Sequence, residues 1–198
     1  MCGIVGYIGK REAYPILING LKRLEYRGYD SAGIALLEDG HIRVEKQVGK
    51  ISALESIIQP EQFTGTTGIA HTRWATHGEP NRENAHPHSD CNGDIVLVHN
   101  GIIENYQSLR QMLMEKGHHF KTETDTEIIA HLIEELYQNG TSFEEAFLGA
   151  LQQVEGTYGL ALITRHEPDR IYAARKGSPL VVGIGDGEYF LGSDAAAL

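Results

Sequence analysis

Hydrophobic and polar positions follow two different periods near the start of the chain. Small and apolar residues over 2–8 have the pattern of a strand, whereas over 12–26 the apolar residues recur at three- and four-residue spacing. The second spacing predicts an amphipathic helix, in which Pro15 fits only if it lies in the first turn. Two further strand-like segments, 31–37 and 41–47, are separated by a short turn and predict a β-hairpin.

Helix-start signals dominate the middle of the chain. A Ser or Thr followed three residues later by Glu, the spacing of a capping box, occurs at Ser52–Glu55, Thr124–Glu127 and Ser142–Glu145. Each pair predicts the first turn of a helix. Helical spacing also covers 105–116, where Gly117 is a suitable C-terminal stop.

Strand-like patterns occupy most of the remaining chain. The segments that show them are 68–74, 94–99, 158–164, 170–175, 180–184 and 188–191. Strands therefore group towards both ends of the chain, with helices between them. This grouping is typical of antiparallel sheets with helices packed outside, rather than of an alternating parallel sheet. We predict an α+β domain with two sheets.

Length, charge and cysteine content narrow the range of settings and partners. A chain of 198 residues favours one large domain, or at most two small ones, and its formal net charge of −10 argues against a nucleic-acid or anionic-membrane partner. No apolar run approaches the roughly 20 residues that span a bilayer. The N-terminus lacks the basic leader of a secretory signal. Cys2 and Cys91 alone do not make a disulfide scaffold, so we expect a reducing, cytoplasmic setting.

Cys2 is the first candidate for chemistry. Removal of Met1 would leave a cysteine whose own α-amino group lies a few bonds from its thiol. An α-amine titrates at about 7.7–8.0 and a cysteine thiol at about 8.5, so the two exchange a proton easily. The amine can therefore act as general base for a thiol nucleophile. The simpler alternative is a buried, inert cysteine in an edge strand.

Three further positions complete a candidate site. Arg73, beside the single tryptophan Trp74, can bind a carboxylate through two parallel hydrogen bonds. Asn100 and Gly101 follow an apolar strand and offer an amide and a backbone N–H as oxyanion donors. Asp125, at a predicted helix start, can bind an ammonium group. Each has a simpler interpretation by itself: Arg73 as a surface ion pair, Trp74 as a core residue, Asn100–Gly101 as a turn and Asp125 as a helix cap. Together with the thiol, they suit an α-amino acid that carries a cleavable side-chain amide.

The chain also contains four longer motifs in a fixed order. They are MCGIVG at 1–6, LEYRGYDSAG at 24–33, HTRWATHG at 71–78 and NGIIEN at 100–105. The first resembles the start of the class II glutamine amidotransferases, which are N-terminal-nucleophile hydrolases. The other three resemble the glutamine–fructose-6-phosphate branch of that family, and the likeness covers essentially all of the chain. It implies a four-layer α/β/β/α sandwich of two antiparallel sheets.

The resemblance implies a role for each candidate residue. Cys2, after removal of the initiator methionine, is the nucleophile, and Asn100 and Gly101 form the oxyanion hole. Arg73 binds the α-carboxylate of L-glutamine, and Asp125 binds its α-amino group. The residues implied to lie on the substrate side or near the nucleophile are Trp74, Thr76, His77, Arg27 and Gly28.

The implied reaction is hydrolysis of L-glutamine to glutamate and ammonia through a γ-glutamyl thioester, with no cofactor. In the family, the ammonia serves to convert fructose 6-phosphate to glucosamine 6-phosphate in an isomerase domain. Nothing in residues 1–198 supplies that domain, so we expect an isolated glutaminase domain. Its expected partners are L-glutamine and the isomerase domain of a full-length enzyme, which can be a homodimer.

Other interpretations stay open from the sequence. The phosphoribosyl and asparagine branches of the same family are the nearest alternatives. A Cys2–Cys91 redox pair lacks the Cys-x-x-Cys spacing. The polar stretch 78–90 is interpreted as a loop that closes over bound glutamine. The ten histidines suggest a metal-binding module as a further alternative. Six of them form close pairs in the sequence: His71 with His77, His86 with His88, and His118 with His119, with Cys91 nearby. No metal site is predicted, because none of these pairs has the spacing of a structural zinc site.

Overall fold

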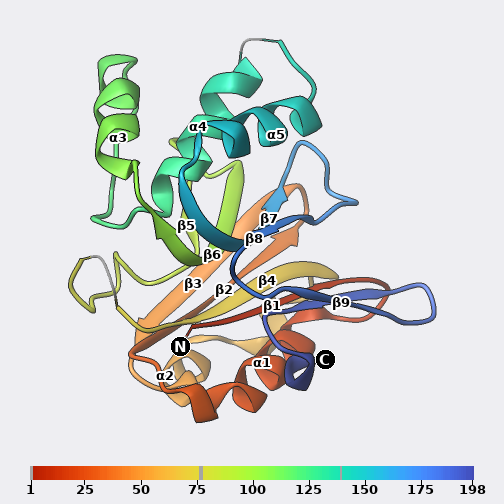
Figure 1. Ribbon diagram of the computed structural model, residues 1–198. Helices are drawn as coiled ribbons and strands as arrows, with labels where there is room; N and C mark the ends of the chain where they lie inside the picture. The colour runs from red at the N-terminus through yellow and green to blue at the C-terminus, as the bar shows by residue number, and fades with distance from the viewer. Residues whose placement is uncertain (1, 76–77, 139) are drawn as a thin grey trace.

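The computed structural model describes residues 2–75, 78–138 and 140–198. Two antiparallel sheets lie face to face, with helices on both outer surfaces (Figure 1). The six-stranded sheet has the order β3 (His41–Val48), β2 (Ser31–Glu38), β4 (Thr67–Arg73), β1 (Gly3–Ile8), β10 (Tyr189–Gly192) and β9 (Val181–Ile184). The four-stranded sheet has the order β5 (His88–Ser89), β6 (Ile95–Ile103), β7 (Gly156–Thr164) and β8 (Tyr172–Lys176).

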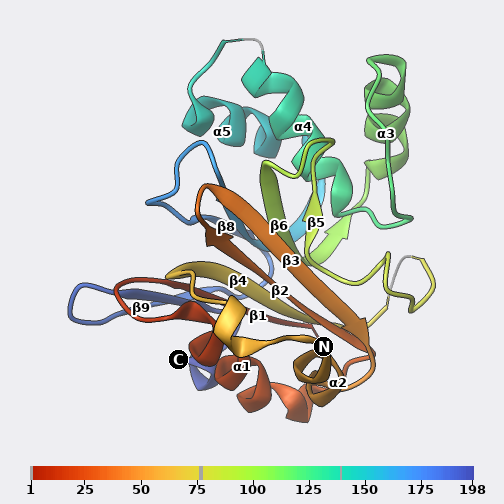
Figure 2. The same ribbon diagram turned by 180° about the vertical axis from the view of Figure 1, so that it is seen from behind.

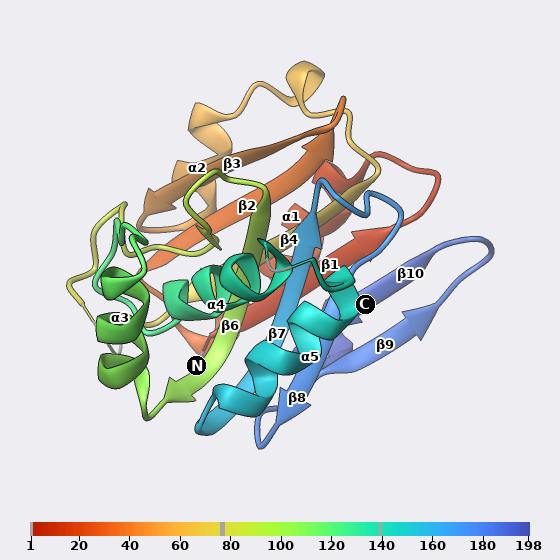
Figure 3. The same cartoon turned by 90° about the horizontal axis from the view of Figure 1, so that it is seen from above.

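The helices divide between the two outer layers. One group lies under the six-stranded sheet (Figure 2) and comprises α1 (Ala13–Arg23) and α2 (Ile51–Ile57). The other lies on the four-stranded sheet, where the view from above shows α4 (Glu127–Gln138) and α5 (Phe143–Gln153) over the strands and α3 (Tyr106–Glu115) beside α4 (Figure 3). Short 3₁₀ turns are η1 (Glu25–Arg27), η2 (Pro60–Gln62) and η3 (Ala195–Ala197). The predicted four-layer α/β/β/α arrangement is confirmed.

Each pair of adjacent layers encloses its own hydrophobic core. Strand β6 contributes to two of these cores, because its continuous apolar run 95–98 is buried on both faces. Val96 and Val98 pack between the two sheets, whereas Ile95 and Leu97 pack under α4 and α5. A third core fills the space between the six-stranded sheet and helices α1 and α2. A strand covered on both sides needs apolar residues at every position, which explains the missing alternation.

Three predicted helix starts are confirmed within one residue, those of α1, α3 and α5, and two of them have a clear local cause. Pro15 is the third residue of α1, where its missing N–H costs no hydrogen bond. Ser142 and Glu145 form the capping box before α5. The Ser142 hydroxyl accepts from the Glu145 N–H at 3.2 Å, and the Glu145 carboxylate accepts from the Ser142 N–H at 2.9 Å.

The other two capping boxes were wrong. Helix α2 begins at Ile51, with Lys50 as N-cap and no side-chain cap, so Ser52 lies inside the helix. Helix α4 begins at Glu127 rather than near Thr124. The Glu127 carboxylate turns back instead and accepts the N–H groups of Lys121 and Thr122, at 2.7 and 2.8 Å. A buried carboxylate takes the nearest unpaired donors, and here they belong to the preceding connection.

The topology gathers the candidate residues at one end of the two sheets. Cys2 directly precedes β1, which pairs with β4 so that the start of one strand faces the end of the other. Arg73 is the last residue of β4. Asn100 and Gly101 lie in β6 of the facing sheet, which continues beyond the predicted end at 99. They are therefore strand residues, and the interpretation of this pair as a turn was wrong.

Candidate active site

The backbone of Trp74 holds the thiol of Cys2. The Trp74 N–H donates to Sγ at 3.2 Å, and the thiol points at the Trp74 carbonyl oxygen at 3.7 Å. The next two residues are fixed by side chains of neighbouring strands. The Gly3 N–H donates to the Thr72 hydroxyl at 3.1 Å, and the Ile4 N–H donates to the Ser193 hydroxyl at 3.0 Å. Burial raises the pKa of the Cys2 thiol, so formation of the thiolate requires a base.

The side-chain amide of Asn100 is oriented towards Cys2 by a buried histidine. Nδ2 of Asn100 donates to the Cys2 carbonyl oxygen at 3.2 Å, while Oδ1 lies 2.9 Å from Nε2 of His71. Nε2 of His71 also lies 3.1 Å from the carbonyl oxygen of His99. Burial lowers the pKa of His71 to about 3, so the ring is neutral at pH 7. With both neighbours being oxygen acceptors, Nε2 carries the proton, and the amide nitrogen of Asn100 faces the thiol side.

Gly101 occupies a backbone conformation that no other residue tolerates. Its φ is +137°, and a Cβ on it would lie 2.0 Å from the carbonyl oxygen of Thr157 on the adjacent strand. Glycine is therefore required by close approach as well as by the dihedral angle. Asn100 and Gly101 line the same cavity as Cys2, and a side-chain amide with an adjacent backbone N–H is the kind of donor pair that an oxyanion hole uses.

Arg73 and Asp125 bring opposite charges to the same cavity. Arg73 is 3% exposed, and its guanidinium lies 3.4 Å from the carbonyl oxygen of Glu79; burial lowers its pKa. Asp125 is 4% exposed, and its Oδ2 accepts the N–H of Ile103 at 2.7 Å. Asp125 therefore holds the end of β6 and does not cap α4. Arg73 ends strand β4, and Asp125 lies in the α3–α4 connection, where its hydrogen bond to Ile103 ties it to β6.

These residues line one cavity of about 420 Å³. Among the predicted residues it brings together Cys2, Arg27, Arg73, Trp74, Asn100, Gly101 and Asp125. Gly28, at a φ of +73°, lies under the Trp74 ring, where a Cβ would be 3.4 Å from the ring carbons. Arg27 forms an ion pair with Asp194. Thr76 and His77 lie outside the described residues.

Two supporting residues were missed by the sequence analysis. His71 orients Asn100, as described above. Asp30 accepts the N–H of Ala75 through Oδ2 at 2.6 Å and the hydroxyl of Ser31 through Oδ1 at 3.0 Å. It thereby holds the chain just after Trp74, whose backbone contacts the thiol. Asp30 lies in the motif at 24–33 and His71 in the motif at 71–78, but their roles become clear only from their hydrogen-bond partners.

The stretch 78–90, interpreted above as a loop that closes over bound glutamine, is exposed in one part and buried in another. Its first part is exposed, and Arg73 lies against the carbonyl oxygens of Gly78 and Glu79. Its second part is buried, because Asn84 is 1% exposed and accepts the N–H of Glu123 at 2.9 Å. The amine of Lys46 donates to three carbonyls of this part at 2.8 to 3.2 Å. Closure of the first part over a ligand stays a prediction.

Four histidines are buried together beside the site and have lowered pKa values. They are His71, His86, His88 and His99, and burial is the main cause for each. The rings of His71 and His86 stack with centroids 4.2 Å apart, so a proton on one ring would put a positive charge directly against the other.

We therefore expect acid to destabilise the fold below pH 6.5. The unfolded chain binds a proton on each of these histidines near that pH, but folded His71 does so only at about 3. Unfolding thus takes up protons, and the free energy of unfolding should fall by about 1.4 kcal/mol per pH unit for each such histidine. Urea denaturation across this pH range measures the slope. His88→Gln should make it shallower, and the exposed His41→Gln should leave it unchanged.

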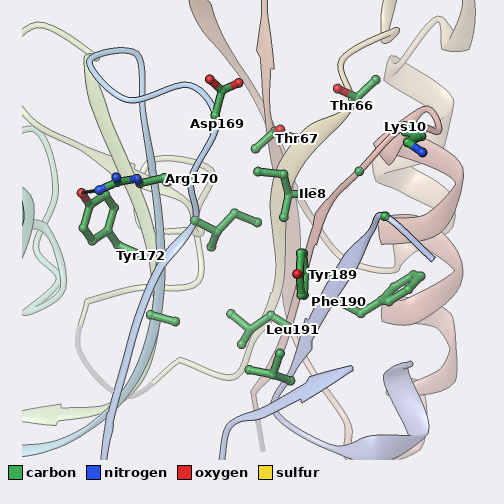
Figure 4. A pocket seen from close by; sticks show the side chains of 15 residues that line it. Ile8, Lys10, Thr66, Thr67, Asp169, Arg170, Tyr172, Tyr189, Phe190 and Leu191 are labelled. Atoms are coloured by element: carbon green, nitrogen blue, oxygen red, sulfur yellow. Dashed lines mark hydrogen bonds between the residues drawn. The ribbon is translucent and has the colours of Figure 1, made fainter. Parts of the chain in front are cut away.

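A second cavity, of about 620 Å³, lies away from the thiol, at the other end of β1 (Figure 4). Its walls include Ile8, Phe190, Leu191 and Tyr172, with Arg170 donating to the Tyr172 hydroxyl at 3.4 Å. None of the predicted site residues that the structure describes lines it. We therefore place the chemistry at the smaller cavity, where a thiol, paired N–H donors and two opposite charges meet.

Among the described residues, no helix is long and apolar enough to cross a membrane.

Comparison with known proteins gives a consistent result. Residues 71–198 match a family model described as a glutamine amidotransferase domain. The whole chain is 54% identical to a glutamine–fructose-6-phosphate aminotransferase (isomerizing) of Chlorobaculum tepidum and 56% identical to one of Bacteroides thetaiotaomicron. It spans 33% of the length of each of these relatives. A solved glutamine phosphoribosylpyrophosphate amidotransferase from B. subtilis matches 99% of this chain and 42% of its own, with a TM-score of 0.85 and 29% identity.

Proposed function

Since the chain belongs to the glutamine amidotransferase family, we propose that it hydrolyses the side-chain amide of L-glutamine to glutamate and ammonia. The observation that carries the proposal is the arrangement around Cys2. Its thiol shares one cavity with the paired donors Asn100 and Gly101 and with the opposite charges Arg73 and Asp125. A nucleophile, an oxyanion hole and two handles for an amino acid are the parts this reaction requires.

The proposed mechanism begins after removal of Met1. The new α-amine takes the thiol proton, and the sulfur attacks the amide carbon to form a C–S bond. The N–H groups of Asn100 and Gly101 stabilise the oxyanion. The ammonium then returns its proton to the leaving nitrogen, the C–N bond breaks and ammonia departs. Water, deprotonated by the same amine, hydrolyses the γ-glutamyl thioester, releases glutamate and restores the thiol of Cys2.

Arg73 and Asp125 are proposed to orient the substrate. The guanidinium binds the α-carboxylate of glutamine through two hydrogen bonds, and the carboxylate of Asp125 binds the α-ammonium. Because both side chains are almost fully buried, water competes poorly for either interaction. Trp74 and Arg27 lie at the same cavity and complete its wall.

Intact-mass analysis with a diazoketone analogue of glutamine tests the proposal directly. We expect loss of the Met1 mass and one covalent adduct, which peptide mapping assigns to Cys2. The same treatment of Cys2→Ala should give no adduct. An adduct on any other residue would defeat the proposal, as would failure of excess glutamine to slow the labelling.

Replacing Arg73 by lysine should chiefly weaken glutamine binding. Lysine keeps the charge but cannot form two parallel hydrogen bonds to a carboxylate. We expect KM for glutamine to rise by about 10- to 100-fold, with kcat changed far less. Steady-state assays of glutamate release measure both constants. An unchanged KM would show that the carboxylate is bound elsewhere.

The activity of the full-length protein is a further proposal. The chain spans about a third of the length of its curated relatives, whose name describes amino-group transfer to fructose 6-phosphate. We propose that residues 1–198 are the glutaminase domain of such an enzyme, and that an isomerase domain uses the ammonia to make glucosamine 6-phosphate. The 54% identity to these relatives favours this branch over the phosphoribosyl branch, where the identity is 29%. Cytoplasmic location, a homodimer and the absence of nucleic-acid partners stay predictions.

A further inference from the structure

Four potential metal ligands converge on one point beneath α4, away from the glutamine cavity. They are Sγ of Cys91, Nδ1 of His118, Nδ1 of His131 and one carboxylate oxygen of Glu134, all within 4.8 Å of one another. The two histidines and the glutamate are buried, and Cys91 is half-buried. None of the four lines the cavity that contains Cys2.

Five of the six distances between these atoms are close to the edges of a tetrahedron around zinc, and all six are at most 4.8 Å. The two Nδ1 atoms lie 3.2 Å apart, and each lies 3.1 to 3.2 Å from Oε2 of Glu134. Sγ of Cys91 lies 3.7 Å from Nδ1 of His118 and 3.5 Å from Nδ1 of His131. Zinc bonds of about 2.0–2.1 Å to nitrogen and about 2.3 Å to sulfur predict edges of roughly 3.3 and 3.6 Å.

The opposite side of each imidazole is held as metal-bound histidines usually are. Nε2 of His118 lies 3.2 Å from a carboxylate oxygen of Glu135, and Nε2 of His131 lies 3.5 Å from one of Glu127. A carboxylate that accepts the Nε2 proton leaves the Nδ1 lone pair directed at the cluster, which is the tautomer that a metal ion requires. This pairing of a carboxylate with the far nitrogen is the common outer shell of a zinc–histidine site.

Glu134 is oriented in the same way. Its Oε1 accepts from the side-chain amides of Asn92 and Gln138, at 3.3 and 3.5 Å, which leaves Oε2 directed at the cluster. Oε2 also accepts the backbone N–H of Cys91 at 3.2 Å. A metal ion binds cysteine as the thiolate and histidine as the neutral imidazole. The lone pairs of two nitrogens, one oxygen and one sulfur then face one another at a buried point. A bound cation would stabilise this arrangement.

We propose that Cys91, His118, His131 and Glu134 bind one zinc ion as a closed structural site. Zinc replaces the thiol proton, which is released to solvent, and the S–H bond gives way to a Zn–S bond without any redox change. One thiolate, one carboxylate and two neutral imidazoles balance the two positive charges. All four positions of the ion are taken by protein, so no position is open for a reactive water.

The site would tie together three segments that are separate in the chain. Cys91 lies between β5 and β6, His118 lies between α3 and α4, and the other two ligands lie on α4 (Figure 1). The same α3–α4 connection carries Thr124, Asp125 and Thr126 into the wall of the glutamine cavity. Zinc would therefore act on catalysis through the position of this connection, and its main effect would be on stability.

The sequence analysis predicted no metal, and the spacing explains why. The ligands are separated by 27, 13 and 3 residues, which matches no recurrent zinc motif. It also grouped His118 with its neighbour His119, which is exposed. The structure instead pairs His118 with a histidine on the next helix.

Metal content and cobalt spectroscopy test the proposal. The chain produced with zinc in the medium should hold about one zinc per molecule by mass spectrometry of metals, and a strong chelator should lower its Tm by roughly 10 °C. Cobalt(II) added to the chelated protein should give the intense visible bands of a tetrahedral site and a sulfur-to-cobalt charge-transfer band.

Matched variants assign the ligands. Cys91→Ser should lose the charge-transfer band and most of the zinc, and Glu134→Gln should also lose zinc. His119→Ala, next to a proposed ligand, and Cys2→Ala, which removes the other thiol, should keep both. Chelated wild-type protein that takes up neither zinc nor cobalt would overturn the proposal and leave a hydrogen-bonded cluster. Metal retained by Cys91→Ser, or lost in His119→Ala, would overturn this ligand set. These results are independent of the glutaminase assay.

Discussion

Replacing Cys2 by alanine should reduce glutamine hydrolysis by about 10⁵- to 10⁶-fold, the loss expected when an enzyme's nucleophile is removed. The cavity also contains hydroxyl groups, and the one nearest to a histidine nitrogen belongs to Thr126. The hydroxyl of Thr126 contacts Nε2 of His86 at 3.0 Å and Nδ1 of His99 at 2.9 Å. Because Thr126 is only 1% exposed, its hydroxyl cannot take the place of the Cys2 thiol, and the loss should not be rescued from within the site.

Release of glutamate from glutamine, followed with a coupled assay, measures this loss. Calorimetric titration with glutamine should still detect binding to Cys2→Ala, because Arg73 and Asp125 are intact. Residual hydrolysis within about tenfold of wild type would mean that another group attacks the amide.

A second variant separates the thiol from the α-amine. An N-terminal extension that cannot be removed leaves Cys2 in place but converts its amine into a peptide N–H, which is not a base. Burial raises the pKa of this thiol, so the extended protein should be slow both to form the thiolate and to protonate the leaving ammonia. Turnover by the extended form equal to that of the processed form would rule out the amine as base.

The parts of the fold that were predictable are those in which one local pattern decides the outcome. The helical spacing ahead of Leu24 reflects one buried face, the apolar run around Ala35 reflects a strand buried on both faces, and both elements formed where expected. The capping box at Ser142 formed because nothing else competes for those exposed groups. At Glu127 the same sequence pattern failed, because the buried carboxylate had backbone donors closer at hand.

The candidate site was predictable only as far as its motifs reach. Cys2, Arg73 and Asn100 stand out because their chemistry is rare at such positions in the chain. His71 and Asp30 do not, since a buried histidine and a turn aspartate are both common. Their roles follow from atoms contributed by other strands: the Oδ1 of Asn100 for one and the N–H of Ala75 for the other. Sequence spacing contains no information about such contacts.

Replacing Asn100 by alanine should lower kcat by about 100- to 1,000-fold while leaving KM for glutamine nearly unchanged. The amide N–H groups act where negative charge develops in the transition state, whereas Arg73 and Asp125 bind the ground state. This is the reverse of the pattern expected for Arg73→Lys, so the pair of variants separates the two halves of the site. Near-normal turnover by Asn100→Ala would remove this residue from the oxyanion hole.

The histidine behind Asn100 makes the test sharper. His71 contacts Oδ1 of Asn100 at 2.9 Å, so it can affect the oxyanion only by orienting that amide. We expect His71→Ala to lower kcat by a smaller factor, and the double variant to be no slower than Asn100→Ala alone. Independent structural damage would instead make the two losses multiply. Thermal unfolding of all three variants shows how much protein is folded in each assay. Multiplying losses in fully folded protein would mean that His71 does not act through Asn100.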